Sequence, residues 1–261
     1  MRRILYLITL LLLFFAACVS AEEMISPAHE KKPVNNGEDM TRPLWRFDAR
    51  YMFQAYNPGC HSHTFTPRLD MPLQLAKKWQ LYLRVDGPFE MNNEKGPTNP
   101  NKYYKFGASD LLTQALLIYD FDKRWSWGAG SQVVFPTARP IQLGQESYQL
   151  RPINGIRCML PEISDGSFFL LGLRYAIDCG GFDGRHYWNE LQISPELNVM
   201  FPKGWFVTFF PSPDIRISFE NSGKLFLPLN IMVGKMFGEK MIMSTEFGFP
   251  MINDYYVYDF K

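Results

Sequence analysis

The stretch NELQISPELNVMFPKGWFVTFFPSPDIRISF, residues 189–219, contains two runs in which every second residue is apolar. The first run begins at Leu191 and the second at Trp205, and only the short polar turn Pro202-Lys203-Gly204 separates them. Successive side chains of a β-strand point to opposite faces, so this period of two predicts a pair of antiparallel strands. The pattern leaves open whether the apolar face packs inside a soluble protein or contacts a membrane.

The same alternation recurs along most of the chain from Trp45 onward, and no stretch shows the period of 3.6 that predicts a helix. We count about twelve strands, each near the roughly 9–11 residues that a tilted membrane-spanning strand needs. The clear apolar rows lie in residues 45–53, 69–75, 79–85, 169–177, 189–199, 205–219, 225–233 and 241–249, and weaker ones in 110–119, 127–135, 150–160 and 255–260.

The connections between these predicted strands alternate in length. Short connections at one end and long polar loops at the other are typical of an outer-membrane β-barrel. An even number of strands would place both chain ends on the periplasmic side. The short connections are residues 76–78, 122–124, 161–167, 202–204 and 238–240, the longer ones are 87–105, 137–149 and 180–187, and 220–224 is a short exception.

The N-terminal sequence MRRILYLITLLLLFFAACVSA has two arginines, an apolar core and a small-residue cleavage site. This order predicts a secretory signal peptide over residues 1–21. An uncleaved anchor or lipidation at Cys18 are the alternatives. Residues 22–44 are polar and predict a flexible segment, so the barrel domain covers 45–261. Cys60, Cys158 and Cys179 remain after cleavage, with one disulfide possible among them.

Three tryptophans indicate which face of the strands is in contact with lipid. Trp79, Trp125 and Trp205 each follow a short turn that contains lysine, and aromatic residues beside cations are typical of a membrane–water interface. We therefore predict that these three form part of an aromatic girdle. The apolar rows also carry almost no charge, as a lipid-facing surface requires, because a mid-depth Lys or Arg costs about 2–4 kcal/mol. The apolar, odd-numbered side chains from Trp45 to Met251 should face outward.

The polar rows should then line the interior of a closed, antiparallel transmembrane β-barrel. A mixed-charge interior passes small solutes without a cofactor, because polar walls replace hydration and the charges set a sign preference. A structural ion-pair network is the alternative role for these residues. Five prolines within the predicted strands should sit near rims or at bulges: Pro195, Pro211, Pro213, Pro228 and Pro250. The predicted interior residues are Arg84, Arg174, Glu190, Glu196, Asp214, Arg216 and Glu246.

Four blocks resemble those of one bacterial family: GASDLLTQALLIY (107–119), WGAGSQVVFPTA (127–138), FPKGWFVTFFPSPDIRISF (201–219) and LFLPLNIMVGKMF (225–237). The family is named after a phenol-degradation pathway, and its members carry the labels transporter or neuromedin U. The resemblance implies an outer-membrane β-barrel that passes small molecules, including hydrophobic or aromatic ones, and it supplies no catalytic residues. Ala108 departs from the family pattern, which has glycine there.

These observations predict a porin-like transporter in the outer membrane of a Gram-negative bacterium. Its expected partners are outer-membrane lipid, a small-molecule solute and the barrel-insertion machinery. Lys261 follows Phe260, so the usual terminal aromatic is missing, which indicates a shortened last strand or an unusual targeting signal. The net charge of +1 and mean hydropathy of −0.18 suggest neither nucleic-acid binding nor a set of membrane helices.

Two other functions compete with transport. The first is a closed barrel with a plugged interior whose loops bind a partner, favoured by residues 87–105. The second is a lipid-acting barrel enzyme that depends on His61, His63 or His186. We expect none of the histidines, His29 included, to lie on a strand, and their spacing matches no catalytic triad. His61 and His63 could bind a metal, but a polar loop is the simpler interpretation. We therefore assign no catalytic residue, metal ligand or cofactor.

Overall fold

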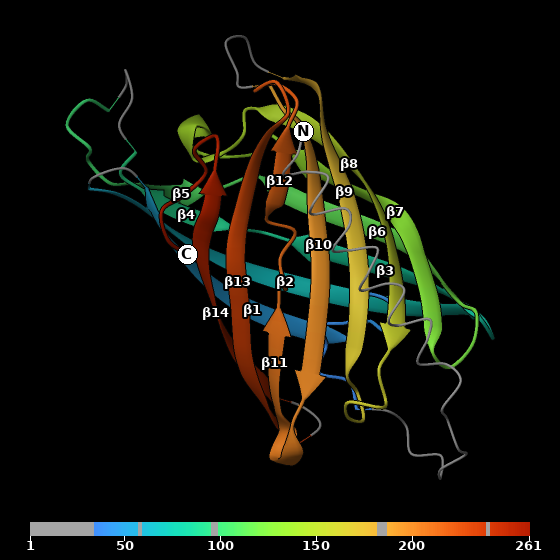
Figure 1. Ribbon diagram of the computed structural model, residues 1–261. Coiled ribbons are helices and arrows are strands. Elements are labelled where there is room, and N and C mark those ends of the chain that lie inside the picture. Colours follow the sequence, from blue (N-terminus) through green and yellow to red (C-terminus); the bar gives the residue numbers. More distant parts are fainter. Residues whose placement is uncertain (1–33, 57–58, 95–98, 182–186, 239–240) are drawn as a thin grey trace.

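The computed structural model describes residues 34–56, 59–94, 99–181, 187–238 and 241–261. This part of the chain is all-β, as predicted, and its strands form a single antiparallel sheet. The sheet curves around an interior (Figure 1). The predicted signal peptide lies outside the described residues. The strands are β1 (Arg46–Tyr56), β2 (Cys60–Ala76), β3 (Trp79–Asp86), β4 (Phe89–Asn92), β5 (Lys105–Ala108), β6 (Leu111–Asp120), β7 (Trp125–Phe135), β8 (Ser147–Met159), β9 (Phe168–Gly181), β10 (Asn189–Met200), β11 (Trp205–Phe209), β12 (Ile215–Ser218), β13 (Lys224–Phe237) and β14 (Met241–Asn253).

Most strands pair with their neighbours in the sequence, so the sheet is an up-and-down meander. At three places in the sheet, two short strands follow one another along the same line. These are β3 and β4, which both pair with β2; β5 and β6; and β11 and β12, which both lie between β10 and β13. The described chain therefore has more strands than the sequence predicts. Short 3-10 turns at Ile141–Leu143 and Pro202–Gly204 are the only helical elements described, and neither is long or apolar enough to cross a membrane.

Several predicted boundaries were wrong. The predicted loop 87–105 contains β4, and the predicted single strand 205–219 is broken at residues 210–214. The predicted strand 255–260 is not a strand: a single bridge joins Phe260 to Ala55. His61 and His63, which we expected in a loop, lie on β2 opposite Ala55 and Phe53.

Proline explains the break between β11 and β12. Pro211 and Pro213 lie within it, where their missing N–H groups cost the sheet no ladder bond. Pro195 of β10 lies opposite the same break, because neither β11 nor β12 extends to residues 194–196. Pro228 pairs with Pro250 directly beside a register shift. These placements agree with the expectation that the prolines sit at irregular positions.

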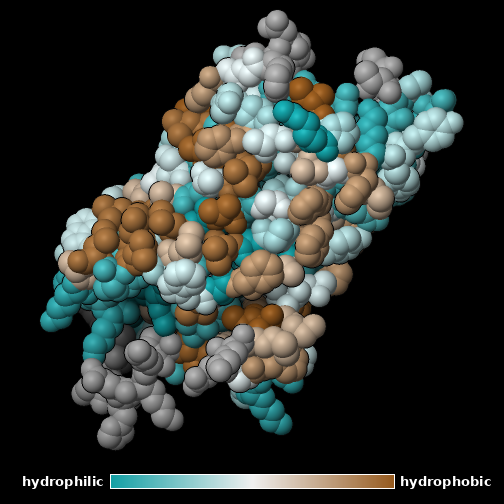
Figure 2. Space-filling model, turned by 180° about the vertical axis from the view of Figure 1, so that it is seen from behind, coloured by the Kyte–Doolittle hydropathy of each residue, from teal (hydrophilic) through white to brown (hydrophobic). Residues whose placement is uncertain are grey.

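The two faces of the sheet have opposite chemistry. Many apolar side chains of the odd-numbered rows are exposed, with Phe47 at 70%, while polar residues of the even-numbered rows such as Asp70, Gln114 and Asn198 are buried. The odd-numbered rows of β10, β12 and β13 are an exception, because they contain a buried cluster of Ile193, Ile215, Ile217 and Leu225. Figure 2 shows hydrophobic side chains across the middle of one outer side and hydrophilic ones toward its ends. The sheet is thus apolar outside and polar inside, the reverse of a soluble globular domain.

Strand β8 is an exception to the predicted odd-numbered outer row. Its buried residues include Gln149 and Arg157, whereas Tyr148 and Leu150 are exposed. In β8 the odd-numbered side chains point inward, whereas in most other strands the even-numbered ones do. The connections on either side of β8 cause this change, and no physical rule keeps the inward-pointing residues odd or even from one strand to the next. The prediction therefore failed for this strand, and it missed Arg157.

Both described chain ends lie against the inner face. From the N-terminal residues 34–44, Met40 packs on the cluster of Tyr82, Leu116 and Ile118. At the other end of the chain, Tyr258 is fully buried and its ring contacts Phe226 edge-on. The part of the predicted flexible segment that the structure describes thus fills space inside the sheet.

Candidate functional site: the charged interior

We call the end of the sheet with the short connections 77–78, 121–124, 160–167 and 201–204 the turn end, and the opposite end the loop end. The polar inner face holds two groups of charged residues. The first group surrounds a cavity of about 140 Å³, which we call the inner cavity. This volume has room for roughly five water molecules. The second group lies around the C-terminal residue.

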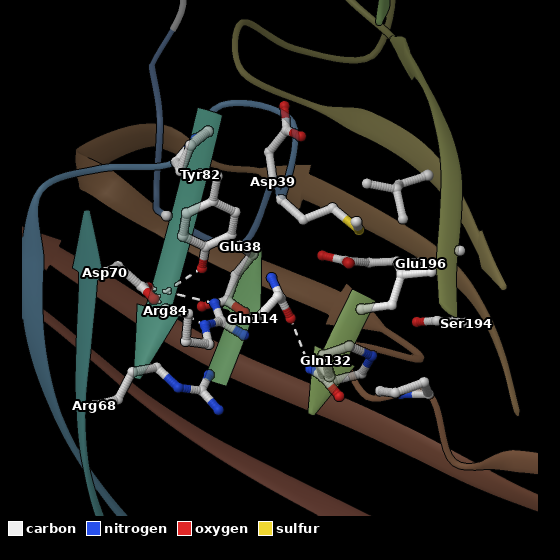
Figure 3. A pocket seen from close by; sticks show the side chains of 18 of the residues that line it. Glu38, Asp39, Arg68, Asp70, Tyr82, Arg84, Gln114, Gln132, Ser194 and Glu196 are labelled. Atoms are coloured by element: carbon white, nitrogen blue, oxygen red, sulfur yellow. Dashed lines mark hydrogen bonds and ion pairs between the residues drawn. The ribbon is translucent and has the colours of Figure 1, made fainter. Parts of the chain in front are cut away.

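Asp70 organises one wall of the inner cavity. Its carboxylate accepts hydrogen bonds from Arg84 Nε at 2.8 Å, Arg46 Nε at 3.0 Å and the Tyr82 hydroxyl at 2.8 Å. Asp70 stands directly opposite Arg84 in the register of β2 and β3, so the fold itself brings the pair together. Figure 3 shows Asp70, Tyr82 and Arg84 gathered on one side of the cavity. Two cations thus share one buried carboxylate.

A second ion pair extends this wall. Arg68 donates to both carboxylate oxygens of Asp86, at 2.7 and 2.6 Å. This two-pronged geometry is the strongest form of an arginine–carboxylate pair. Arg68 lies opposite Asp86 in the register of β2 and β3, two residues from the pair of Asp70 and Arg84. The side chains alternate in charge along and across these two strands.

Arg174 is held differently, by neutral amides. It donates to Gln132 Oε1 at 2.9 Å and to Gln192, and Gln132 in turn donates to Gln114 at 2.6 Å. Arg174 makes no ion pair with any carboxylate in the described part of the chain. Its charge therefore faces the cavity without a matched partner.

Glu196 lies across the cavity from Asp70 and Arg84, beside Ser194 (Figure 3). Its side chain is buried, and its Oε1 atom has no hydrogen-bond partner among the described residues. A buried carboxylate oxygen without a partner is costly unless something else solvates it. The inner cavity, which Glu196 lines, is the place where water or a solute group would do so.

Residues 34–44 form the remaining side of the cavity and are anchored at the turn end. Arg157 Nε lies 3.3 Å from Asp39 Oδ2 and 3.1 Å from Thr41 Oγ1, and Asn36 donates to Asn198 at 2.9 Å. All of these groups are buried. The N-terminal segment thus fits the polar interior through specific contacts.

The second group of charges converges on Lys261. Its ammonium lies 2.5 Å from Asp214 Oδ2 and 2.6 Å from Glu246 Oε1. Arg216 contacts Asp214 at 3.3 Å and Glu190 at 3.8 Å. This group holds the C-terminal segment inside the sheet.

All seven predicted interior residues lie on the inner face, but in two separate groups. Arg84, Arg174 and Glu196 line the inner cavity, whereas the other four belong to the network around Lys261. Glu190 and Arg216 also line a pocket of about 440 Å³ at the loop end, together with Tyr255. The sequence did not indicate Arg157 or Lys261 as interior residues, because their partners lie on distant elements.

The three predicted girdle tryptophans are the first residues of β3, β7 and β11 and all lie at the turn end. Trp79 packs on Tyr119 with ring centroids 4.6 Å apart, and Lys235 Nζ lies 5.0 Å above the Trp205 ring. Trp125 is partly buried against the cluster of Cys158, Leu160 and Phe169. Two of the three are thus exposed aromatic residues that interact with other rings or cations.

The two described histidines contact aromatic residues. Tyr51 is hydrogen-bonded to His63 Nδ1 at 2.7 Å, and His61 stacks on Phe53 with centroids 5.6 Å apart. Within the described residues, no group of three or more His, Cys, Asp or Glu side chains could hold a metal ion. His29 and His186 lie outside these residues. Cys60, Cys158 and Cys179 form no disulfide with one another.

Comparison with known proteins adds no assignment to this picture. A scan against protein-family models finds no match to the chain, and a search of curated proteins finds none either. The family resemblance of the four sequence blocks therefore stays a prediction.

Proposed function

We propose that this protein is a closed β-barrel of the bacterial outer membrane that passes small molecules. The observation that carries this proposal is the inverted chemistry of the sheet, with exposed apolar side chains outside and buried charged residues inside. In water such an apolar exterior would far exceed the patches that soluble monomers expose. In a bilayer the same exterior matches the lipid, and the polar interior is typical of a barrel.

Closure of the barrel is supported by the C-terminal residues. Ala55 N donates to Phe260 O at 2.9 Å, and Asp259 N donates to Ala55 O at 2.8 Å. Lys261 N and O both bond to Gly248 of β14, at 2.9 and 2.8 Å. Residues 259–261 therefore connect the first strand of the sheet to the last at one part of their length, at Ala55 and Gly248. A spanning sheet needs such closure, because unpaired edge groups are costly in lipid.

The charged interior would select the solute. Arg174 faces the inner cavity without a carboxylate partner, so its charge should favour anions, whereas the unpartnered carboxylate of Glu196 across the cavity should favour cations. Replacing Arg174, as Arg174→Gln, should shift the reversal potential of bilayer currents toward cations. Lys203→Gln, which removes a charge from an exposed turn, is the matched control and should leave the reversal potential unchanged.

The transport proposal is tested with purified protein in liposomes and planar bilayers. We expect solute-dependent liposome swelling and discrete conductance steps. Absence of both would overturn transport. Membrane insertion is tested separately: the protein should require detergent and should migrate differently on a gel before and after heating. A protein that stays monodisperse without detergent would overturn the membrane assignment.

A second function is favoured by the filled interior. Residues 34–44 occupy the turn end and residues 255–261 the inner face near the loop end, which supports a closed barrel that binds a partner through its loops. Deleting residues 93–104, within the connection between β4 and β5, would separate the two functions. If the deletion abolishes binding of the partner and leaves solute flux unchanged, the binding function is supported. If binding of the partner is unchanged, the binding function is opposed.

A further inference from the structure

The first and last strands of the sheet meet at a seam that is only half closed. At the loop end, residues 259–261 bond to both β1 and β14. Toward the turn end, the described residues form no ladder between the two strands, since β1 pairs only with β2 and β14 only with β13. The seam therefore differs along its length.

The open half of the seam is a cleft of about 430 Å³. Its β1 side runs from Arg46 to Tyr51, and its β14 side includes Ile242, Met243, Ser244 and Glu246. Arg50 and Ser244 belong to the polar rows of their strands and yet are exposed. The cleft is thus an opening in the side of the sheet.

This cleft adjoins the inner cavity. Glu38, Arg46 and Arg50 line both. Their side chains form the boundary between the interior and the seam. Arg46 is held there by ion pairs with Asp48 and Asp70, and Arg50 by an ion pair with Asp48, so a solute would have to displace these side chains to pass from one space to the other.

The outer mouth of the cleft is apolar. Phe47, Tyr51 and Met243 line it and are among the most exposed large hydrophobic residues. Its charged residues, in contrast, are of both signs: Glu38, Asp48 and Glu246 oppose Arg46 and Arg50. An apolar mouth with nearly balanced charges behind it suits a molecule with an apolar body and a neutral polar end. Arg46 and Arg50 are already paired with Asp48, and Glu246 with Lys261, so a fully charged head would compete with ion pairs that are already formed.

We propose that the seam between β1 and β14 is a lateral opening through which small neutral amphiphiles exchange between the inner cavity and the bilayer. This inference rests on the proposed function, because it requires the apolar exterior to face lipid. The inference adds to the proposed function a lateral route for the solute and a class of solute, the small neutral amphiphiles. The axial path is narrowed by the two chain ends, whereas the seam leads from the cavity directly to the apolar surface.

The opening is tested by locking it. In a Cys179→Ser background, the pair Asp48→Cys and Ser244→Cys spans the cleft, and a reducible bifunctional thiol reagent of suitable length joins them. The control pair, Ala115→Cys and Ser131→Cys, joins two positions already opposite each other in the ladder of β6 and β7. The probe is octanol carrying a photoreactive diazirine, added to phosphatidylcholine vesicles that contain the full chain.

Photolabelling of Ile153 and Leu170, which line the inner cavity, reports entry of the probe. We expect labelling in the unlocked protein, at least a tenfold loss in the locked protein, recovery after reduction, and no loss with the control pair. Equal labelling in the locked and unlocked proteins, or none at these residues in either, would overturn the lateral opening. Swelling with a small sugar is measured in parallel. Absent swelling with seam-dependent labelling would overturn only sugar transport.

Discussion

Strands β9 and β10 and strands β1 and β14 carry the same alternation but end in different environments. β9 and β10 pair along ten consecutive positions, and inner-row residues such as Gln192 and Glu196 are buried. β1 and β14 each pair with a strand on one side only, and inner-row residues such as Arg50 and Ser244 are exposed. Alternation thus decides which way a side chain points, and the neighbouring strand decides whether that side chain is buried.

This difference in burial between the continuous wall and the seam should have its strongest effect on the stability that ion pairs contribute. A pair inside the continuous wall is withdrawn from water, so each charge depends on its partner. A pair at the seam keeps its hydration and gains little from the partner. Replacing the arginine of an ion pair by methionine in the wall and at the seam therefore compares how far each pair is withdrawn from water.

The largest effect is expected for Arg157→Met in the wall. The side chains of Arg157 and Asp39 are only 3% and 2% exposed, so the substitution leaves a buried carboxylate without its cation. We expect a loss of about 3–5 kcal/mol in the free energy of unfolding, measured by urea titration of tryptophan fluorescence in detergent micelles. Adding Asp39→Asn should recover part of this loss. A loss below about 1 kcal/mol would mean that the pair is hydrated.

An intermediate effect is expected for Lys261→Met, where wall and seam meet. The ammonium serves both Asp214 and Glu246, and charge-assisted hydrogen bonds contribute about 1.5–3 kcal/mol. We expect a loss near the lower end of this range, together with faster thiol cross-linking at the seam because the C-terminal segment is released. Lys261→Arg keeps the charge and should lose less. Unchanged cross-linking would show that Lys261 does not hold the seam.

The sequence predicted the all-β class and the alternating faces of most strands, because these depend on a local period of two. It did not predict the inverted parity of β8, since the parity of a strand depends on how its connections fold. It also missed the pairs of Lys261 with Asp214 and Arg157 with Asp39. Their partners come from distant segments, so no spacing in the sequence indicates them.

The break between β11 and β12 was predicted only in part. Pro211 and Pro213 indicated an irregularity, but their effect depends on β10, whose residues 194–196 lose a neighbour there. Ser194 Oγ instead donates to Phe210 O at 3.0 Å. A local signal thus marked the position, and only the pairing of strands revealed its consequence.

The smallest effect is expected for Arg50→Met at the seam. Arg50 contacts Asp48 at 3.0 Å with its side chain 42% exposed, and exposed ion pairs contribute roughly 0–1 kcal/mol. The free energy of unfolding should fall by less than about 1 kcal/mol, several-fold less than for Arg157→Met in the same titration. Because Arg50 also borders the inner cavity, the substitution should still increase amphiphile labelling of Leu170. A loss as large as that of Arg157→Met would mean that the seam is as closed as the wall, and the contrast between the two regions would no longer hold.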